Sequence, residues 1–327
     1  MSVPGRVGAR RVVLTLLCLG IVFGATTAPA HAFGASVPPA PARADRDDST
    51  LTAAAARNAS LHVTLDSLHG RSGKLLMRLV SKARATLVLP LFAAFFGDSA
   101  VERPGLYSLP DSIFAHPFTF IALRPFADKQ KGRVGGYRMG FWPNERGRAT
   151  TDAYENPDGF IEVTPENQNM QVSEHFKLSD FLTHDQREVW PKYLVLNEDL
   201  VDKLELVIAQ LQQNGIRVQR MVVMSGFRTP WYNRNGGRVG GRAELSRHMY
   251  GDAADVYVDN GSGRMADLNH DGRVDSRDAK VILHAVEQVE KEHPELSGGV
   301  GVYRATRNHG PFAHVDVRGW RARWGRS

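Results

Sequence analysis

The stretch SRHMYGDAAD, residues 246–255, carries more information than any other part of this 327-residue chain. It fits the pattern S-x-H-x-x-G-x-A-x-D, with two potential metal ligands, His248 and Asp255. Between them Gly251 permits a sharp turn, because glycine adopts backbone conformations that other residues avoid. We therefore expect a loop histidine and a strand carboxylate to meet at one point.

A third potential ligand lies further along the chain, in FAHVD, residues 312–316. Alternation along a strand would put His314 and Asp316 on the same face. Two histidines and one carboxylate, with a fourth position open to water, are the ligand set of a catalytic zinc. Taken singly, each residue has an ordinary interpretation, as a loop histidine, a helix cap or a strand histidine.

Three motifs in order resemble the zinc D-Ala-D-Ala carboxypeptidase family of peptidoglycan peptidases, which has the hedgehog/D-Ala-D-Ala peptidase fold. The resemblance runs from about Val172 to Trp324, nearly half of the chain. SGFRTP (225–230), followed by Asn233, resembles the family's S-G-[FY]-R-[ST]-P segment. Residues 246–255 resemble its first metal motif, and residues 298–303 with 312–319 resemble its closing segment.

The resemblance implies that His248, Asp255 and His314 bind one catalytic zinc. It implies that Arg228 contacts the substrate or the developing oxyanion, although a structural ion pair is the alternative, and that Ser246 hydrogen-bonds the substrate backbone. The implied activity is a D,D-carboxypeptidase or endopeptidase that hydrolyses peptide bonds of peptidoglycan stem peptides by attack of a zinc-bound water.

The general base is where the sequence departs from the family pattern. The family places an acidic residue three positions before the last histidine, or a histidine two before it. Here those positions hold Pro311 and Phe312, which cannot transfer a proton. The remaining candidates are His309 and Asp316, and Asp316 is equally suited to orienting a ligand. A cell-wall-binding module that keeps the zinc pocket without catalysis is therefore the alternative function.

Residues 267–278, DLNHDGRVDSRD, fit an EF-hand calcium loop with glycine at position 6. Asp at position 12 resembles the loops of dockerin modules. An acidic surface turn is the alternative, and a dockerin-type scaffold protein would carry paired loops. The expected ligands of this single structural calcium are Asp267, Asn269, Asp271, the Arg273 carbonyl, Asp275 and Asp278.

The pattern of the C-terminal region, residues 167–327, predicts an α+β domain with an antiparallel sheet and flanking helices, because strands and helices mix without a βαβ rhythm. Apolar spacing predicts two helices, over 198–214 and 278–293, and four strands, over 221–224, 253–258, 301–303 and 313–317.

Upstream, residues 61–166 predict an accessory region with a helical segment followed by a small β-rich domain. The segment 61–96 shows mixed helical patterning and ends in an apolar run, which we interpret as a buried helix. The predicted strands of the β part cover 118–123, 136–141 and 159–163. An Ala/Pro-rich linker is expected over residues 33–60.

The pattern of residues 1–32 predicts a signal peptide, with three arginines, an apolar run over 12–23 and a cleavage site at Ala30-His31-Ala32. We therefore expect an exported, periplasmic or extracellular protein associated with the cell wall, without a membrane span after cleavage. A net charge of +6 is too mild to indicate nucleic acid as a partner. Peptidoglycan peptides are the expected partner, and the oligomeric state stays open.

Overall fold

The computed structural model describes residues 67–82, 88–109, 117–148, 151–235 and 242–325. The predicted signal peptide and linker, residues 1–60, lie outside the described residues. All of the described residues belong to one compact unit.

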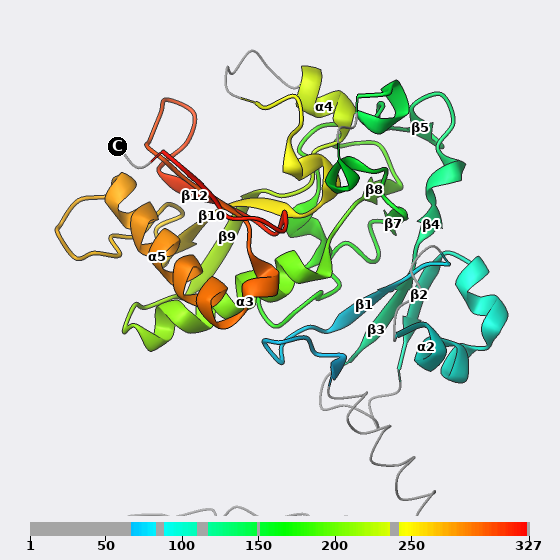
Figure 1. The fold of residues 1–327 in the computed structure, drawn as a ribbon, viewed down its shortest axis with the longest axis horizontal. Coiled ribbons are helices and arrows are strands. Elements are labelled where there is room, and N and C mark those ends of the chain that lie inside the picture. Colours follow the sequence, from blue (N-terminus) through cyan, green and yellow to red (C-terminus); the bar gives the residue numbers. More distant parts are fainter. Residues whose placement is uncertain (1–66, 83–87, 110–116, 149–150, 236–241, 326–327) are drawn as a thin grey trace, which may run out of the picture. The chain divides into compact units, whose positions relative to one another are not determined.

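A five-stranded sheet forms the centre of the C-terminal region, in the order β13-β11-β12-β10-β9 (Figure 1). Neighbouring strands are antiparallel except β11 and β13, which run parallel. This sheet confirms the α+β prediction. Its strands are β9 Arg220–Ser225, β10 Ala253–Asp259, β11 Gly299–Tyr303, β12 Phe312–Asp316 and β13 Ala322–Trp324.

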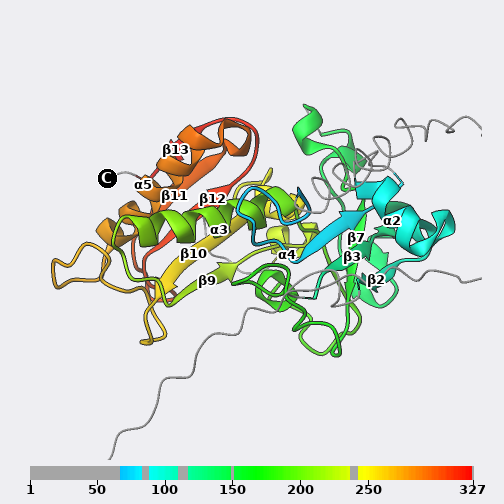
Figure 2. The same cartoon turned by 90° about the horizontal axis from the view of Figure 1, so that it is seen from below.

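Two helices, α3 (Glu198–Gln213) and α5 (Ser276–Glu292), contact each other, and α5 also contacts β11 and β12 (Figures 1 and 2). The Asn197 side chain caps α3 by accepting a hydrogen bond from a first-turn amide. Their apolar stripes join the main hydrophobic core with the strands of the sheet. The structure therefore has the flanking helices that the periodicity predicts, within two residues of the expected bounds.

The face of the sheet that does not join this core carries the polar residues of interest. Ala254 and Val256 on β10, and Ala313 and Val315 on β12, belong to the core. Because successive side chains of a strand point to opposite faces, the residues between them, such as Asp255, face the other way.

A smaller sheet, in the order β1-β3-β2, forms a second core with α2 (Val88–Phe96). The apolar run does form a helix, but only Leu91 and Phe92 of its nine residues are buried. The prediction of helical patterning was wrong at Met77–Val80, which form β1 and pair in parallel with β3 (Thr119–Ala122). That pairing is with a strand about forty residues away, so local patterning could not show it. The antiparallel partner of β3 on its other side is β2 (Gly105–Ser108).

A third sheet, β4-β7-β8, connects the two regions that the sequence suggested as separate. Its strand β7 (Gly159–Val163) has the predicted bounds and pairs with β4 (Arg124–Pro125) on one side and β8 (Lys192–Leu194) on the other. The sheet therefore contains residues from both sides of the boundary predicted at residues 166–167.

The predicted strand over 136–141 is only two residues long, because β6 (Tyr137–Arg138) pairs with β5 (Arg133–Val134) and then ends. Two residues later Gly140 adopts a φ of +85° and lies so close to α4 (Pro230–Asn235) that a Cβ would be 2.6 Å from the Trp231 nitrogen. The chain therefore leaves the strand direction to pack against α4.

Among the described residues, none of the helices has the length and apolar character needed to cross a membrane.

Candidate metal centre

Three side chains from two parts of the sequence converge on one buried point. His248 Nε2 lies 3.3 Å from Asp255 Oδ1 and 3.2 Å from His314 Nδ1, and the latter two atoms are 3.0 Å apart. All three residues are buried. Among the described residues they form the only group of three His, Cys, Asp or Glu side chains that converge within 4.8 Å. The structure therefore brings together the three predicted zinc ligands.

The strand register and one glycine turn produce this convergence. In the β10–β12 ladder Asp255 lies directly opposite His314, and opposite residues on one face of an antiparallel pair have neighbouring side chains. His248 comes from a single 3-10 turn, Arg247–Tyr250, that ends at Gly251 with a φ of +68°. A Cβ at Gly251 would lie 2.2 Å from the Val195 carbonyl oxygen, so only glycine fits there.

An acceptor behind each histidine orients its ring. The Gly226 carbonyl oxygen lies 2.7 Å from His248 Nδ1, and Asp316 Oδ2 lies 3.0 Å from His314 Nε2. If these nitrogens carry the protons, His248 Nε2 and His314 Nδ1 present their lone pairs to the centre. One carboxylate oxygen and two imidazole nitrogens fit the donor set of zinc.

The electrostatics of the group favour an ionised carboxylate. Burial would raise the pKa of Asp255, but interactions with His248 and His314 hold that pKa well below its usual range. Burial lowers the pKa of His248. For His314, burial lowers the pKa, yet hydrogen bonds with Asp255 and Asp316 raise it overall to about 9. In the metal-free chain a proton on His314 therefore occupies the place that a cation would take.

Asp316 supports His314 and is not available to solvent. It is fully buried, and its Oδ1 accepts hydrogen bonds from the Gly299 amide at 2.6 Å and from Arg318 Nε at 2.9 Å. Of the two roles left open by the sequence, this geometry matches the orienting one. Arg318 and the Gly226 carbonyl were not predicted. Arg318 follows Asp316 by two residues, a spacing that could have indicated the pair.

Arg228 and Ser246 both lie beside the centre. Arg228 donates from Nε to Ser225 Oγ at 2.9 Å, and its Nη2 forms an ion pair with Asp255 Oδ2. Burial lowers the pKa of Arg228. Ser246 is buried and directly precedes the turn that holds His248. The structure therefore shows the ion pair that was the alternative interpretation of Arg228, in contact with a predicted ligand.

His309 lies in the loop between β11 and β12, away from the converging atoms. Its backbone oxygen accepts a hydrogen bond from the Thr306 amide at 2.8 Å, and its ring meets Phe312 edge-on at 5.0 Å. Since Phe312 precedes His314 by two residues on β12, both side chains are on the same face. His309 is thus at the rim of the face that carries the centre.

The predicted calcium loop, residues 267–278, is organised by its own backbone. Asp267 accepts from the Asp271 and Gly272 amides, at 3.2 and 2.8 Å, and Gly272 has a φ of +80°. Asp278 is fully buried, and its oxygens accept from the amides of Leu268, Asn269 and Asp275, all of which precede α5. The remaining predicted ligands are Asn269 and Asp271, which are hydrogen-bonded to each other, the exposed Arg273, and Asp275, which caps α5.

Comparison with known proteins finds one family model that is similar to part of the chain. The model of the family described as Peptidase M15 matches residues 175–279, about a third of the chain. No curated protein matches the chain. Among solved structures, the crystal structure of Serratia marcescens L-Ala D-Glu endopeptidase ChiX is 22% identical, with 39% of this chain and 85% of that chain covered and a TM-score of 0.26. Such a TM-score supports no inference about this chain. The family match does include His248 and Asp255, so the segment that supplies two of the three converging ligands is similar to peptidases of the M15 family.

Proposed function

We propose that this chain is a zinc-dependent peptidase that hydrolyses peptide bonds of peptidoglycan stem peptides, as a D,D-carboxypeptidase or an endopeptidase. The observation that carries the proposal is the convergence of His248 Nε2, Asp255 Oδ1 and His314 Nδ1 within 3.0–3.3 Å. The match of residues 175–279 to the Peptidase M15 family supports the peptidase activity.

The roles of the chain's residues follow from their contacts. A bound zinc supplies Lewis-acid activation of water and of a peptide carbonyl. Asp316 and the Gly226 carbonyl hold the two imidazoles in the orientation that binding requires. We assign to Arg228, which pairs with Asp255, contact with the substrate or the developing oxyanion, and to Ser246, which precedes the turn of His248, a hydrogen bond to the substrate backbone.

The test is product analysis by mass spectrometry. Purified peptidoglycan fragments, both crosslinked and uncrosslinked, are incubated with the zinc-loaded chain and with the His314→Ala variant. Peptides shortened by the unmodified chain alone support the proposal, and their masses identify the bond cut. Unchanged fragments in both reactions would contradict it.

His309 is the proposed proton-transfer residue, since Asp316 is buried in its pairing with His314 and Arg318. General acid–base catalysis contributes about 10²–10⁴-fold to a rate. We therefore expect His309→Gln to lose roughly that much activity while keeping its zinc. A fully active His309→Gln variant would contradict the proton-transfer role of His309 and leave the proposed zinc ligands unaffected.

The alternative function is a cell-wall-binding module without catalysis. It is favoured by the fact that, within the described residues, no carboxylate or histidine outside the metal group contacts it except Asp316, which is fully paired. Retention on peptidoglycan without any release of shortened peptides would favour this alternative over the peptidase.

We further propose that residues 267–278 bind one structural calcium, that residues 1–32 direct export and are removed, and that residues 33–60 link the mature N-terminus to an accessory region ending near residue 166. The glycine-centred turn at Gly272 supports the calcium proposal. Sequencing the N-terminus of the exported protein tests the cleavage, which we expect before Phe33.

A further inference from the structure

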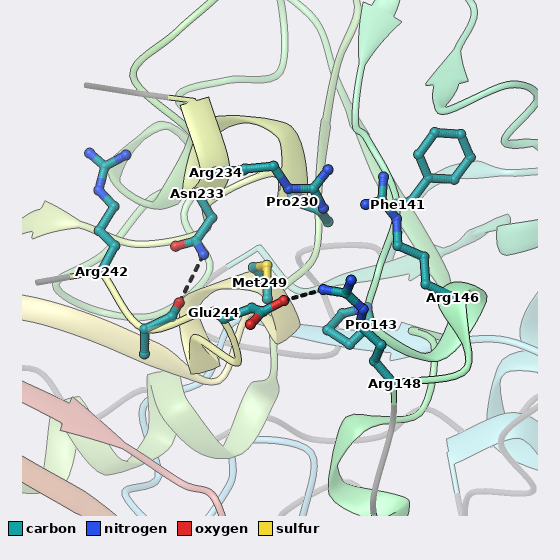
Figure 3. Close-up of a pocket in the computed structure, with 11 residues that line it drawn as sticks. Phe141, Pro143, Arg146, Arg148, Pro230, Asn233, Arg234, Arg242, Glu244 and Met249 are labelled. Atoms are coloured by element: carbon teal, nitrogen blue, oxygen red, sulfur yellow. Dashed lines mark hydrogen bonds and ion pairs between the residues drawn. The ribbon is translucent and has the colours of Figure 1, made fainter. Parts of the chain in front are cut away.

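A cavity of about 360 Å³ is lined by eleven residues, four of which are arginines (Figure 3). Arg146, Arg148, Arg234 and Arg242 contribute guanidinium groups to it. The only acidic side chain in its lining is Glu244, which forms an ion pair with Arg148. The lining therefore carries an excess of positive charge.

Two of these arginines are distinguished by their position. Arg146 and Arg234 also line an adjoining cavity of about 270 Å³, together with Phe141 and Pro230, so they stand between the two spaces. Figure 3 shows their side chains reaching toward the same space from different walls. Neither has a carboxylate partner within the part of the chain that the structure describes. Like charges facing one space repel, and an anion between them would relieve that repulsion.

The cavity is attached to the metal centre through the chain itself. Its lining includes Met249, the residue after the predicted ligand His248. The Met249 carbonyl oxygen accepts a hydrogen bond from Trp142 Nε1 at 2.8 Å, which fixes the neighbouring wall. Arg242 is close enough to Arg228, the partner of Asp255, for its charge to contribute to the lowered pKa of Arg228. The cavity therefore shares a chain segment with His248 and an electrostatic contact with the partner of Asp255.

We propose that Arg146 and Arg234 bind a side-chain or terminal carboxylate of the acidic peptide that is cleaved at the metal centre. The proposal rests on the proposed peptidase function and names its substrate class: a peptide with a free carboxylate near the scissile bond. A guanidinium presents paired donors that match a carboxylate. The apolar surfaces of Phe141 and Pro230 would cover the aliphatic part of the same residue.

The experiment compares one short stem-type peptide in two forms, with the carboxylate free and with the same group as a carboxamide. Each is titrated into the full, zinc-loaded chain by fluorescence anisotropy, and mass spectrometry records whether it is cut. An uncut peptide yields Kd, and a cut one yields KM and kcat. A failure of catalysis is thereby separated from a failure of the cavity.

The unmodified chain should bind the acid at least about tenfold more tightly than the amide, as expected for charge-assisted hydrogen bonds. In the Arg146→Gln/Arg234→Gln variant this ratio should fall to about one. The matched control is Arg264→Gln, at an exposed arginine in the loop after β10, which should keep the full ratio.

Two results would overturn the proposal. One is a ratio of acid to amide affinity near one in the unmodified chain, or a ratio of these affinities that the double variant leaves unchanged. The other is binding of a glycerol-phosphate polymer that depends on Arg146 and Arg234 while the ratio of acid to amide does not. That result would assign the cavity to a phosphodiester polymer of the wall.

Discussion

The metal centre and the loop over 267–278 are two candidate cation sites that the sequence presents with similar clarity, yet the structure builds them differently. At the centre, His248, Asp255 and His314 come from a turn and two strands and point at one another. In the loop, Asp267 and Asp278 already accept hydrogen bonds from neighbouring backbone amides.

The difference concerns what each site gains from a cation. Three buried side chains at 3.0–3.3 Å, one of them a carboxylate, depend on a shared proton or a metal ion, in addition to the Arg228 ion pair, to offset desolvation. The loop carboxylates have backbone donors that offset part of their charge without any ion. We therefore expect the centre to depend strongly on its cation and the loop to depend on it weakly.

The largest effect is expected at the centre. Asp255→Ala or His314→Ala removes one of three ligands, so zinc binding and all peptidase activity above background should disappear. Metal analysis and product analysis of the same preparations check this. Arg264→Gln, which changes an exposed arginine, is the control for effects of substitution and purification. A fully active, zinc-containing His314→Ala variant would contradict the expectation that the centre depends strongly on its cation.

A smaller loss is expected from Asp316→Asn, which keeps the shape of the side chain but weakens the hydrogen bond that orients His314. Changes to such outer partners reduce metal affinity or activity by about 10–100-fold. Competition with a zinc chelator measures the affinity. Because Asp316 also pairs with Arg318, circular dichroism of the variant is needed to show that the fold is retained.

The pH dependence should separate the two sites. The folded pKa of His314 is raised to about 9 from the usual 6.5, so the folded metal-free chain keeps that proton up to about pH 9. The stability that the raised pKa contributes is complete below about pH 6.5 and is lost as the pH rises from there through about 9. Zinc must displace this proton, and its affinity should increase about tenfold per pH unit between pH 7 and 9.

The loop should show no such trend. A hydrogen bond from Arg277 lowers the pKa of Asp275 to about 2, so that carboxylate stays ionised over the same range. Calcium affinity should therefore be flat between pH 7 and 9. Isothermal titration with each metal at several pH values tests both expectations, and parallel slopes for the two metals would contradict the distinction.

The smallest effect is expected from calcium itself. At a calcium concentration about a hundredfold above its dissociation constant, binding stabilises the folded state by about 2.7 kcal/mol, which corresponds to a shift in Tm of roughly 5 °C or more. Removing calcium with a selective chelator should reverse the shift, and Asp267→Ala should abolish it. A Tm that is the same with and without calcium would show that the loop is a surface turn.

The sequence predicted well those elements whose apolar pattern is long and regular. Helices α3 and α5 and strands β10 and β12 lie within two residues of the expected bounds, since their buried positions repeat at helical or strand spacing. Strand β1 was not predicted, because its partner β3 is distant in sequence and only tertiary pairing makes it a strand.

The same distinction holds within the site. The three ligands carry a recognisable spacing, but the Gly226 carbonyl is a backbone group and has no sequence signature. Arg146 and Arg234 are about ninety residues apart, and tertiary contacts such as the packing of Gly140 against Trp231 bring their segments together. Contacts that arise from such packing become visible only in the folded chain.

The central claim is that His248, Asp255 and His314 hold a zinc ion, and elemental analysis of the purified chain tests it most directly. The chain is dialysed against excess zinc and then against metal-free buffer, alongside a His248→Ala/His314→Ala variant. The account predicts one zinc per unmodified chain and none in the variant. A chain without bound zinc, or a variant that binds as much as the unmodified chain, would contradict it.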